Sequence, residues 1–341
     1  MEIRENVSLA EYTTFKIGGP ARFFCVCADE QGVLEAVRFA REKGISIFVL
    51  GGGSNVLVSD DGYHGLVIKM DIGGIKLASE SGGDVIISAG AGVMWDDFVA
   101  HTVEHGLYGL ENLSAIPGTV GACPVQNIGA YGTEASRVVR SVRAYDLQRS
   151  AFVELSAADC GFGYRDSMFK HAKGRYIVTG VAFALKKDAP VDISYKDIKD
   201  YFAAHAITSP THEQVRHAVI DVRWNKLPDW KLWGTAGSFF KNPIISAAQF
   251  KKLSEMYPGL PSYPEPDGRI KTSAGYILDK ICGARGSFAG DVGTYEKQAL
   301  VVVVRKPGVH ASDVVEFTRD LMRQAKEKTD IDLEAEVEWV N

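Results

Sequence analysis

LGGGSNVLV, residues 50–58, is the stretch of sequence on which the fold depends. Before it, the sequence predicts a helix with one apolar face, capped by Asp29 and closed by Gly44, and the apolar run 45–50 that follows predicts a buried strand. Glycines after a strand let the backbone take positive φ and bring bare N–H groups against an anion, and Ser54 and Asn55 add side-chain donors. The pattern favours a phosphate-binding loop. On this segment alone, a tight turn without a ligand is an equally good interpretation.

These glycines do not follow either common nucleotide-binding fingerprint. The third glycine of a Rossmann fingerprint would fall on Val56, and the chain contains no Gly-Lys-Ser/Thr for a Walker loop. A second cluster, 90–92, also follows a predicted strand, but Trp95 stands where the third glycine belongs. Because an indole there blocks the close approach of a pyrophosphate, we interpret the second cluster as a turn.

IPGTVGACPVQNIGAYG, residues 116–132, has neither helical nor strand periodicity. Its glycines and prolines bend and stiffen a backbone that carries almost no charge. Such a loop can lay N–H and C=O groups along a flat heteroaromatic ring or a pyrophosphate. The alternative is a structural crossing between two sheets. A loop of this length inside a compact chain is usually functional.

Three further segments carry candidate polar groups. Arg165 lies in FGYRDS, where an arginine more often anchors a carboxylate or a loop than reacts. Ser238 lies in GTAGSFFKNP without a G-x-S-x-G elbow, which argues against a hydrolase nucleophile. The predicted last strand, 331–340, places three acids on one face, where burial would require a cation or a reacting group for at least one of them. A solvated edge strand is the alternative. The acids are Glu334, Glu336 and Glu338.

HTVEH, residues 101–105, matches the H-x-x-E-H signature of a zinc protease. The predicted helix 94–105 has an apolar stripe that leaves both histidines largely on its solvated face, so we expect no metal site. The stripe comprises Trp95, Phe98, Val99, Thr102 and Val103.

The composition is that of an ordinary globular protein, with 46% apolar and 24% charged residues among 341. At roughly 150 residues a domain, we expect about two domains, with three small ones as the alternative. The formal charge of −5 argues against a broad nucleic-acid-binding face but leaves room for a local cationic pocket. Five scattered cysteines without C-x-x-C spacing predict neither disulfides nor zinc. The chain has no apolar run of ~18 residues and no secretion signal at its N-terminus, so we expect a cytoplasmic protein.

Taken in order, the motifs resemble one family, the UDP-N-acetylenolpyruvoylglucosamine reductases, which are flavoenzymes of peptidoglycan synthesis. Tyr195 in SYKDI resembles the substrate-covering tyrosine loop of the type I branch. The matching motifs are TFKIGGPA (14–21), LGGGSNVLV (50–58), IPGTVGACPVQNIGAYG (116–132), FGYRDSMFK (162–170), GSFFKNP (237–243) and LEAEV (333–337).

The resemblance implies an α+β fold: a two-part FAD-binding module of the vanillyl-alcohol-oxidase (PCMH) type plus a separate α+β substrate-binding domain. The expected parts are a first FAD-binding subdomain (1–70, joined by the C-terminal strand 331–341), a second one (71–190), a linker with the tyrosine loop (191–215) and the substrate-binding domain (216–330).

The resemblance also implies non-covalently bound FAD, held mostly by backbone groups. Cys123 stands where some relatives have serine, so a weaker thiol donor would replace a hydroxyl facing the flavin. The expected cofactor-binding residues are Gly51, Gly53, Ser54, Asn55, Pro117, Gly118, Gly121, Cys123, Gly129 and Arg223.

The implied reaction is the NADPH-dependent reduction of UDP-N-acetylglucosamine enolpyruvate to UDP-N-acetylmuramate, with hydride passing from flavin N5 to C3. The preference for NADPH over NADH comes from the resemblance and from no residue. Arg165 and a protonated Glu336 would stabilise charge on the substrate carboxylate, and Ser238 would protonate C2. Glu338 and Trp339 stand where relatives often have a basic residue. The expected substrate-binding residues are Tyr131, Tyr195, Lys226, Asn242 and Gln298.

Two alternatives remain beside this reading: another flavin oxidase or dehydrogenase on the same module, and an idle UDP-sugar-binding protein. Ser238 and Glu336 argue against a plain alcohol oxidase, which has no need for a hydroxyl that protonates C2. Intact Arg165, Ser238 and Glu336 argue against an idle protein. We expect a monomer that binds neither nucleic acid nor a membrane.

Overall fold

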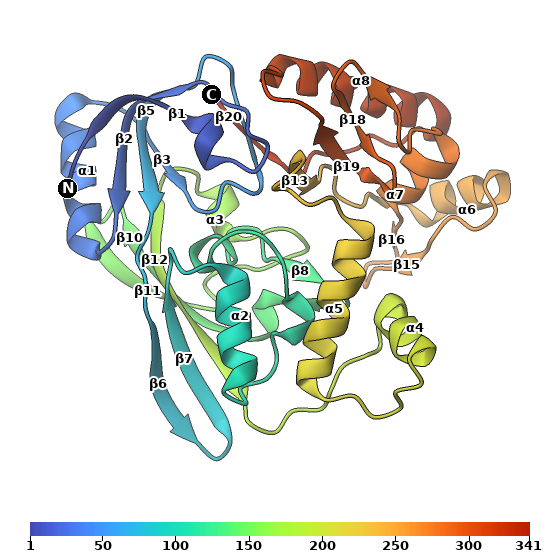
Figure 1. The fold of residues 1–341 in the computed structure, drawn as a ribbon, viewed down its shortest axis with the longest axis horizontal. Helices are drawn as coiled ribbons and strands as arrows, with labels where there is room; N and C mark the ends of the chain where they lie inside the picture. The colour runs from blue at the N-terminus through green and yellow to red at the C-terminus, as the bar shows by residue number, and fades with distance from the viewer. The chain divides into compact units, whose positions relative to one another are not determined.

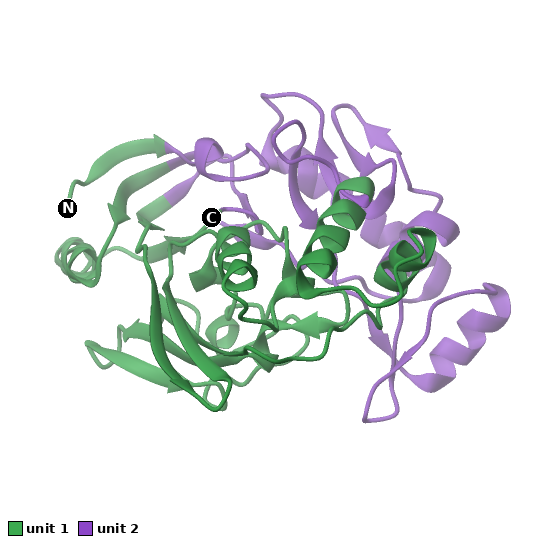
Figure 2. Ribbon diagram, turned by 60° about the horizontal axis from the view of Figure 1, so that its bottom comes forward, with its two compact units in different colours: residues 1–7, 21–52, 64–225 green, residues 8–20, 53–63, 226–341 purple.

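A computed structural model describes residues 1–341. The chain divides into two compact units, each built from three segments (Figure 2). Unit 1 comprises Met1–Val7, Ala21–Gly52 and His64–Asn225, and unit 2 comprises Ser8–Pro20, Gly53–Tyr63 and Lys226–Asn341. The four-part division expected from the sequence is finer than these two units and stays a prediction.

Unit 1 contains two sheets and one short hairpin (Figure 1). Its strands are β1 (Arg4–Ser8), β2 (Pro20–Cys27), β3 (Ile47–Leu50), β5 (Tyr63–Met70), β6 (Ile75–Ser81), β7 (Asp84–Gly90), β8 (Gly129–Ala130), β9 (Thr133–Glu134), β10 (Val139–Asp146), β11 (Ala151–Ser156) and β12 (Tyr176–Lys186). One sheet has the order β1-β2-β5-β3, with β3 and β5 parallel. The other is antiparallel, with the order β11-β10-β12-β7-β6.

The helices of unit 1 are α1 (Glu30–Lys43), α2 (Trp95–Glu104), α3 (Met168–His171), α4 (Lys196–Ala204) and α5 (His212–Lys226). The start and end of α1 are those that the sequence predicts. Asp29 caps it by accepting a hydrogen bond from the Gly32 N–H at 2.7 Å, and Gly44 ends it with a φ of 64°. Helix α2 buries the predicted apolar stripe, where Trp95, Phe98 and Phe183 pack ring against ring.

Unit 2 contains an antiparallel sheet of order β13-β19-β18-β17, a small sheet of order β14-β16-β15 and the parallel pair β4-β20. Its core joins apolar side chains of β19 and α8. The elements are β4 (Val56–Val58), β13 (Gly234–Ser238), β14 (Ile244–Ile245), α6 (Ala247–Met256), β15 (Tyr263–Pro264), β16 (Ile270–Lys271), α7 (Ala274–Tyr276), a π-helical turn (Ile277–Ile281), β17 (Phe288–Ala289), β18 (Val292–Tyr295), β19 (Gln298–Val304), α8 (Ala311–Thr329) and β20 (Glu338–Val340).

The prediction of one continuous last strand over 331–340 is wrong. Only β20 is regular strand, and Ala335 forms a single bridge with Phe240. The reason is that the segment changes its hydrogen-bonding partner: Glu336 N–H donates to the Phe239 carbonyl, whereas Glu338 N–H donates to the Asn55 carbonyl. No helix of the structure is both long and apolar enough to cross a membrane.

Candidate active site

The two predicted ligand-binding loops lie backbone against backbone in unit 1. A Cβ atom on Gly51 would lie 2.7 Å from Thr119 Oγ1, and one on Gly52 would lie 2.7 Å from Gly118 Cα. Real Cβ atoms do not come this close to their neighbours, so position 52 requires glycine against the backbone of Gly118, and a side chain at position 51 would displace the Thr119 hydroxyl. The sequence-distant segments 51–52 and 118–119 therefore form one glycine-lined cradle, to which we refer below by that name.

Thr119 gives this cradle an unsatisfied polar group. Its side chain is 3% exposed, and its hydroxyl is the buried side-chain group without a hydrogen-bond partner. Leaving a buried hydroxyl unpaired costs about 1–3 kcal/mol, so native proteins rarely do so without a reason. Bare backbone beside an orphaned hydroxyl fits the phosphate oxygens of a nucleotide cofactor. The residues of the cradle thus fit FAD.

The loop 116–123 is anchored on the turn that joins β7 to α2. Trp95 N–H donates to the Gly118 carbonyl at 3.0 Å, and Gly121 N–H donates to the Ala91 carbonyl at 2.9 Å. A Cβ atom on Gly121 would lie 2.5 Å from that of Ala91, so this contact also requires glycine. Cys123 is 1% exposed and packs in the apolar core, where burial raises the pKa of its thiol. Its contact with a flavin stays a prediction.

Arg165 lies against the second half of the same loop. Its Nη2 donates to the Gly129 carbonyl at 2.6 Å, and a Cβ atom on Gly129 would lie 2.9 Å from its Nη1. Asn127 ties the two segments together by donating to the Gly163 carbonyl and to the Glu134 carboxylate, each at 2.9 Å. The predicted residues Arg165 and Gly129 are therefore neighbours.

Tyr131, Tyr195 and Arg223 also come together in unit 1. The Tyr131 and Tyr195 rings meet edge to face with centroids 5.3 Å apart. Burial raises the pKa of Tyr131 to about 12, against the opposing effect of Arg223. Burial lowers the pKa of Arg223, which Tyr131 and Asp96 oppose. Arg223 Nε donates to the Ala115 carbonyl at 3.2 Å.

Unit 2 places Ser238, Glu336 and Asn55 near one another. Ser238 ends β13, where Gly237 has a φ of 76° and the register shifts. The next carbonyl, that of Phe239, accepts from Glu336 N–H at 2.8 Å. Asn55 holds the same segment, since its Nδ2 donates to the Glu336 carbonyl at 3.1 Å. One main-chain bond and one bond from the Asn55 side chain thus fix the backbones that carry the predicted proton donor and the predicted acid.

Other predicted residues of unit 2 surround two turns. Asn242 Oδ1 accepts from Ala274 N–H at 3.0 Å, and Gln298 Oε1 lies beside Gly275, so both side chains flank the start of α7. A Cβ atom on Gly53 would lie 1.9 Å from the Tyr12 carbonyl oxygen, which makes glycine obligatory there. Lys226 is exposed at the end of α5.

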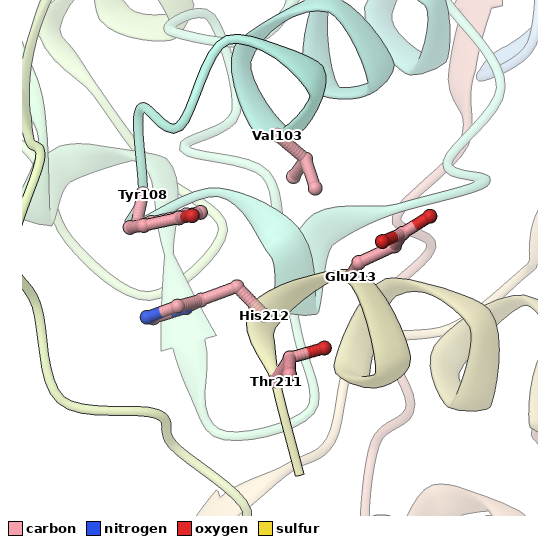
Figure 3. Close-up of a pocket in the computed structure, with 5 residues that line it drawn as sticks. All are labelled: Val103, Tyr108, Thr211, His212 and Glu213. Carbon is pink, nitrogen blue, oxygen red and sulfur yellow. The ribbon is translucent and has the colours of Figure 1, made fainter.

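Sequence reasoning missed a buried pair beside a surface pocket of about 460 Å³, which is lined by Val103, Tyr108, Thr211, His212 and Glu213 (Figure 3). His212 Nδ1 lies 2.6 Å from Glu111 Oε1, and its Nε2 lies 2.9 Å from the Ala189 carbonyl. The ring stacks on Tyr108 at 3.7 Å. Since every partner of His212 is part of the fold, this pair anchors α5. No group of three or more potential ligand side chains could hold a metal ion.

A glycine-lined cradle that fits a flavin nucleotide, on a module of two packed sheets with a second α+β unit, defines a flavoprotein oxidoreductase. Residues 21–156 match the model of the FAD binding domain, and residues 228–340 match that of the UDP-N-acetylenolpyruvoylglucosamine reductase C-terminal domain. The chain belongs to the UDP-N-acetylenolpyruvoylglucosamine reductase family and is an FAD-dependent oxidoreductase. The resemblance and the fold class inferred from the sequence are confirmed.

Similar proteins cover the whole chain. The UDP-N-acetylenolpyruvoylglucosamine reductase of Neisseria gonorrhoeae is 43% identical over 99% of this chain and 97% of its own. That of Pseudomonas aeruginosa is 40% identical over 98% of each chain. The crystal structure of the Thermus caldophilus enzyme superposes over 100% of both chains with a TM-score of 0.69 and 26% identity.

Proposed function

We propose that the protein reduces UDP-N-acetylglucosamine enolpyruvate to UDP-N-acetylmuramate with NADPH, in the synthesis of peptidoglycan precursors. The names of relatives that share 40–43% of its residues support the substrate. The observation that carries the chemistry is the 2.8 Å bond from Glu336 N–H to the Phe239 carbonyl, because it fixes an acid next to the strand end that carries Ser238.

When bound, FAD would supply the hydride chemistry that links NADPH to C3 of the enolpyruvyl group. The residues of the chain must make that enol ether reactive toward hydride. Hydride addition at C3 pushes an electron pair toward the conjugated carboxylate, so this group must be stabilised as its charge grows. Arg165 supplies a permanent, planar cation for it, and its bond to Gly129 orients the guanidinium. Glu336 assists in its protonated form by donating a hydrogen bond.

Ser238 completes the addition by giving a proton to C2. A hydroxyl is a weak acid, so this role is possible only because the enolate-like C2 is strongly basic. A hydrogen bond fixes the backbone on each side of Ser238. Before it, Gly237 N–H donates to Thr235 Oγ1, and after it, Phe239 N–H donates to the Leu300 carbonyl. Ser238 therefore stands between two fixed backbone groups.

The remaining predicted residues serve binding. The glycine-lined cradle and the residues around it hold FAD, and the substrate contacts fall to Tyr131, Tyr195, Lys226, Asn242 and Gln298. Lys226 offers positive charge to the diphosphate of the UDP moiety. A cytoplasmic location, a monomeric state and a preference for NADPH over NADH stay predictions.

An anaerobic visible spectrum of the purified protein tests the proposal. We expect flavin absorbance that bleaches when NADPH is added and returns when UDP-N-acetylglucosamine enolpyruvate follows. A protein that bleaches but stays reduced with the sugar would keep the flavin module and lose the proposed substrate. UDP-N-acetylglucosamine without the enolpyruvyl group is the matched control and must leave the flavin reduced.

A further inference from the structure

We propose that Asp96 and Arg216 form a brace that positions the FAD-binding loop 116–123 by holding Ala115 at its entrance. Asp96 lies in the first turn of α2 and Arg216 on α5, and no motif of the sequence singles out either residue. The inference rests on the FAD site of the proposed function and adds positioning residues to it. It does not depend on the identity of the sugar substrate.

The brace is a fork-on-fork ion pair. Arg216 Nη1 donates to Asp96 Oδ1 at 2.6 Å and its Nη2 donates to Oδ2 at 3.0 Å. The Arg216 side chain is 14% exposed and that of Asp96 is 37% exposed, so solvent screens the pair less than it screens a fully open surface pair. Burial raises the pKa of Asp96, but Arg216 and the Ala115 N–H outweigh it and hold this pKa below its usual value.

Ala115 is held at both ends of its own backbone. Its N–H donates to Asp96 Oδ1 at 2.6 Å, and its carbonyl accepts from Arg223 Nε at 3.2 Å. Ala115 has a φ of 56°, a left-handed conformation that is strained for a residue with a Cβ atom. Strain of this kind persists only where the surroundings over-determine it. Here the carboxylate and the two arginines of α5 do so.

The braced residue stands directly before the loop that forms the cradle. The neighbour of Asp96, Trp95, holds both sides of the same stretch, because its Nε1 donates to the Leu113 carbonyl at 2.8 Å and its N–H to the Gly118 carbonyl at 3.0 Å. The first turn of α2 therefore fixes positions 113, 115 and 118. Only position 115 depends on a charged group that can be changed without removing a core side chain.

Arg216, the second residue of the brace, lies on α5, and this helix also packs against the segment that carries the predicted substrate-covering tyrosine. Arg216 and Arg223 are two turns apart on α5. The apolar face of this helix packs on Ile198 and Phe202, which belong to the neighbouring helix α4 (Figure 1). Tyr195 is the N-cap residue of α4. One helix thus contacts both the entrance of the FAD loop and the tyrosine segment.

The test compares Asp96→Ala with Asp97→Ala. Both remove a carboxylate from the first turn of α2, but Asp97 is exposed. The readout is the FAD dissociation constant, measured from the flavin fluorescence that appears when the holoprotein is diluted. We expect at least tenfold weaker binding for Asp96→Ala and a change of less than twofold for Asp97→Ala. Arg216→Lys, which keeps the charge and loses the fork, is expected to weaken binding about threefold.

Rescue by Ala115→Gly separates positioning from a general loss of stability. Glycine takes a φ of 56° without strain, so it needs the brace less. We expect Ala115→Gly to change FAD affinity less than twofold in the wild type and to restore most of the affinity lost in Asp96→Ala. Equal affinities of Asp96→Ala and Asp97→Ala, or an Asp96→Ala loss that Ala115→Gly leaves unchanged, would overturn the proposal. The readout uses neither NADPH nor sugar, so failure of the proposed reaction is distinguishable from failure of the brace.

Discussion

Arg165 and Gly129, 36 residues apart in the chain, are joined by a 2.6 Å hydrogen bond from the guanidinium Nη2 to the carbonyl oxygen. Arg165 has a φ of 52°, and its own carbonyl accepts from Lys170 Nζ at 2.8 Å. Backbone and side chain are thus fixed together, which places a permanent cation against the loop 116–132. A cation so fixed suits the recognition of a planar carboxylate.

Arg165→Lys should keep the charge but lose the fork. We expect the rate at which the enolpyruvyl sugar reoxidises the enzyme to fall about 10²-fold, because a single ammonium cannot match both carboxylate oxygens. Reduction by NADPH should change less than about threefold. Stopped-flow absorbance of the flavin resolves the two half-reactions.

Arg143→Lys is the matched control, since Arg143 also makes a two-bond pair, with Glu30, outside the candidate site. The rates of both half-reactions in Arg143→Lys should equal those of the wild type. Wild-type reoxidation in Arg165→Lys would contradict the role of the fork in holding the carboxylate.

Ser238→Ala should change the rates of the two half-reactions even more unequally than Arg165→Lys does. We expect reoxidation by the sugar to slow about 10³-fold, because general acid catalysis contributes factors of this size. Reduction by NADPH should survive within about threefold. Ser254→Ala removes another hydroxyl of unit 2, one that bonds the Lys251 carbonyl, and should leave both rates unchanged. Equal losses in both half-reactions of Ser238→Ala would indicate a defect in folding or FAD loading instead.

Local signals in the sequence predicted the elements that they control. Asp29 and Gly44 mark the two ends of α1 correctly, because a cap acts through atoms a few residues away. The spacing of apolar residues predicted the buried face of α2 for the same reason. The family motifs identified the flavin module correctly as well.

Contacts between residues that are far apart in the sequence could not be predicted in the same way. Residues 196–204 belong to the linker that the resemblance implies over 191–215, yet they form α4, because Ile198 and Phe202 find apolar partners on α5. Thr119 shows no signal of its own, since only the fold buries its hydroxyl beside Gly51, which lies 68 positions earlier in the chain. Asp96 resembles any acid of a first helical turn until the structure supplies Arg216 and Ala115.

Asp146 makes stability depend on pH. Hydrogen bonds from Arg175 lower the pKa of this carboxyl to about 2, against the opposing effect of burial and with the help of two backbone N–H groups. A lowered pKa in the folded state stabilises the fold above the ordinary value of 3.8, and this stabilisation is lost as pH falls toward 2. Asp146→Asn should therefore lower Tm at pH 7.

The difference in Tm between Asp146→Asn and the wild type should shrink from about pH 4 downward. Arg175→Gln removes the other partner, whose Nη2 lies 2.8 Å from Asp146 Oδ2, and should show the same trend. Differential scanning calorimetry at several pH values measures both variants. A difference that stays constant from pH 7 to the acid limit of folding would contradict the assignment of this pair.

Thr119→Val should raise the stability of the protein and lower its affinity for FAD, which separates the two effects. Valine has nearly the shape of threonine without the hydroxyl, which is buried and has no partner within the protein. Removing an unpaired buried hydroxyl should stabilise this FAD-free protein by about 1 kcal/mol. If the hydroxyl donates to FAD, its loss should weaken FAD binding about tenfold, the equivalent of one good hydrogen bond to a charged group.

Thermal unfolding of the FAD-free protein and fluorescence titration with FAD measure the two quantities. Thr235→Val is the control, because the hydroxyl of Thr235 is buried but donates to the Val302 carbonyl at 2.8 Å. That variant should lose stability, since it leaves a buried carbonyl without this hydrogen bond. Any weakening of its FAD binding should be explained by the fraction of protein that is unfolded. A Thr119→Val protein that is less stable and binds FAD as tightly as the wild type would show that the hydroxyl serves the fold alone, and that FAD is held in the cradle by backbone groups only.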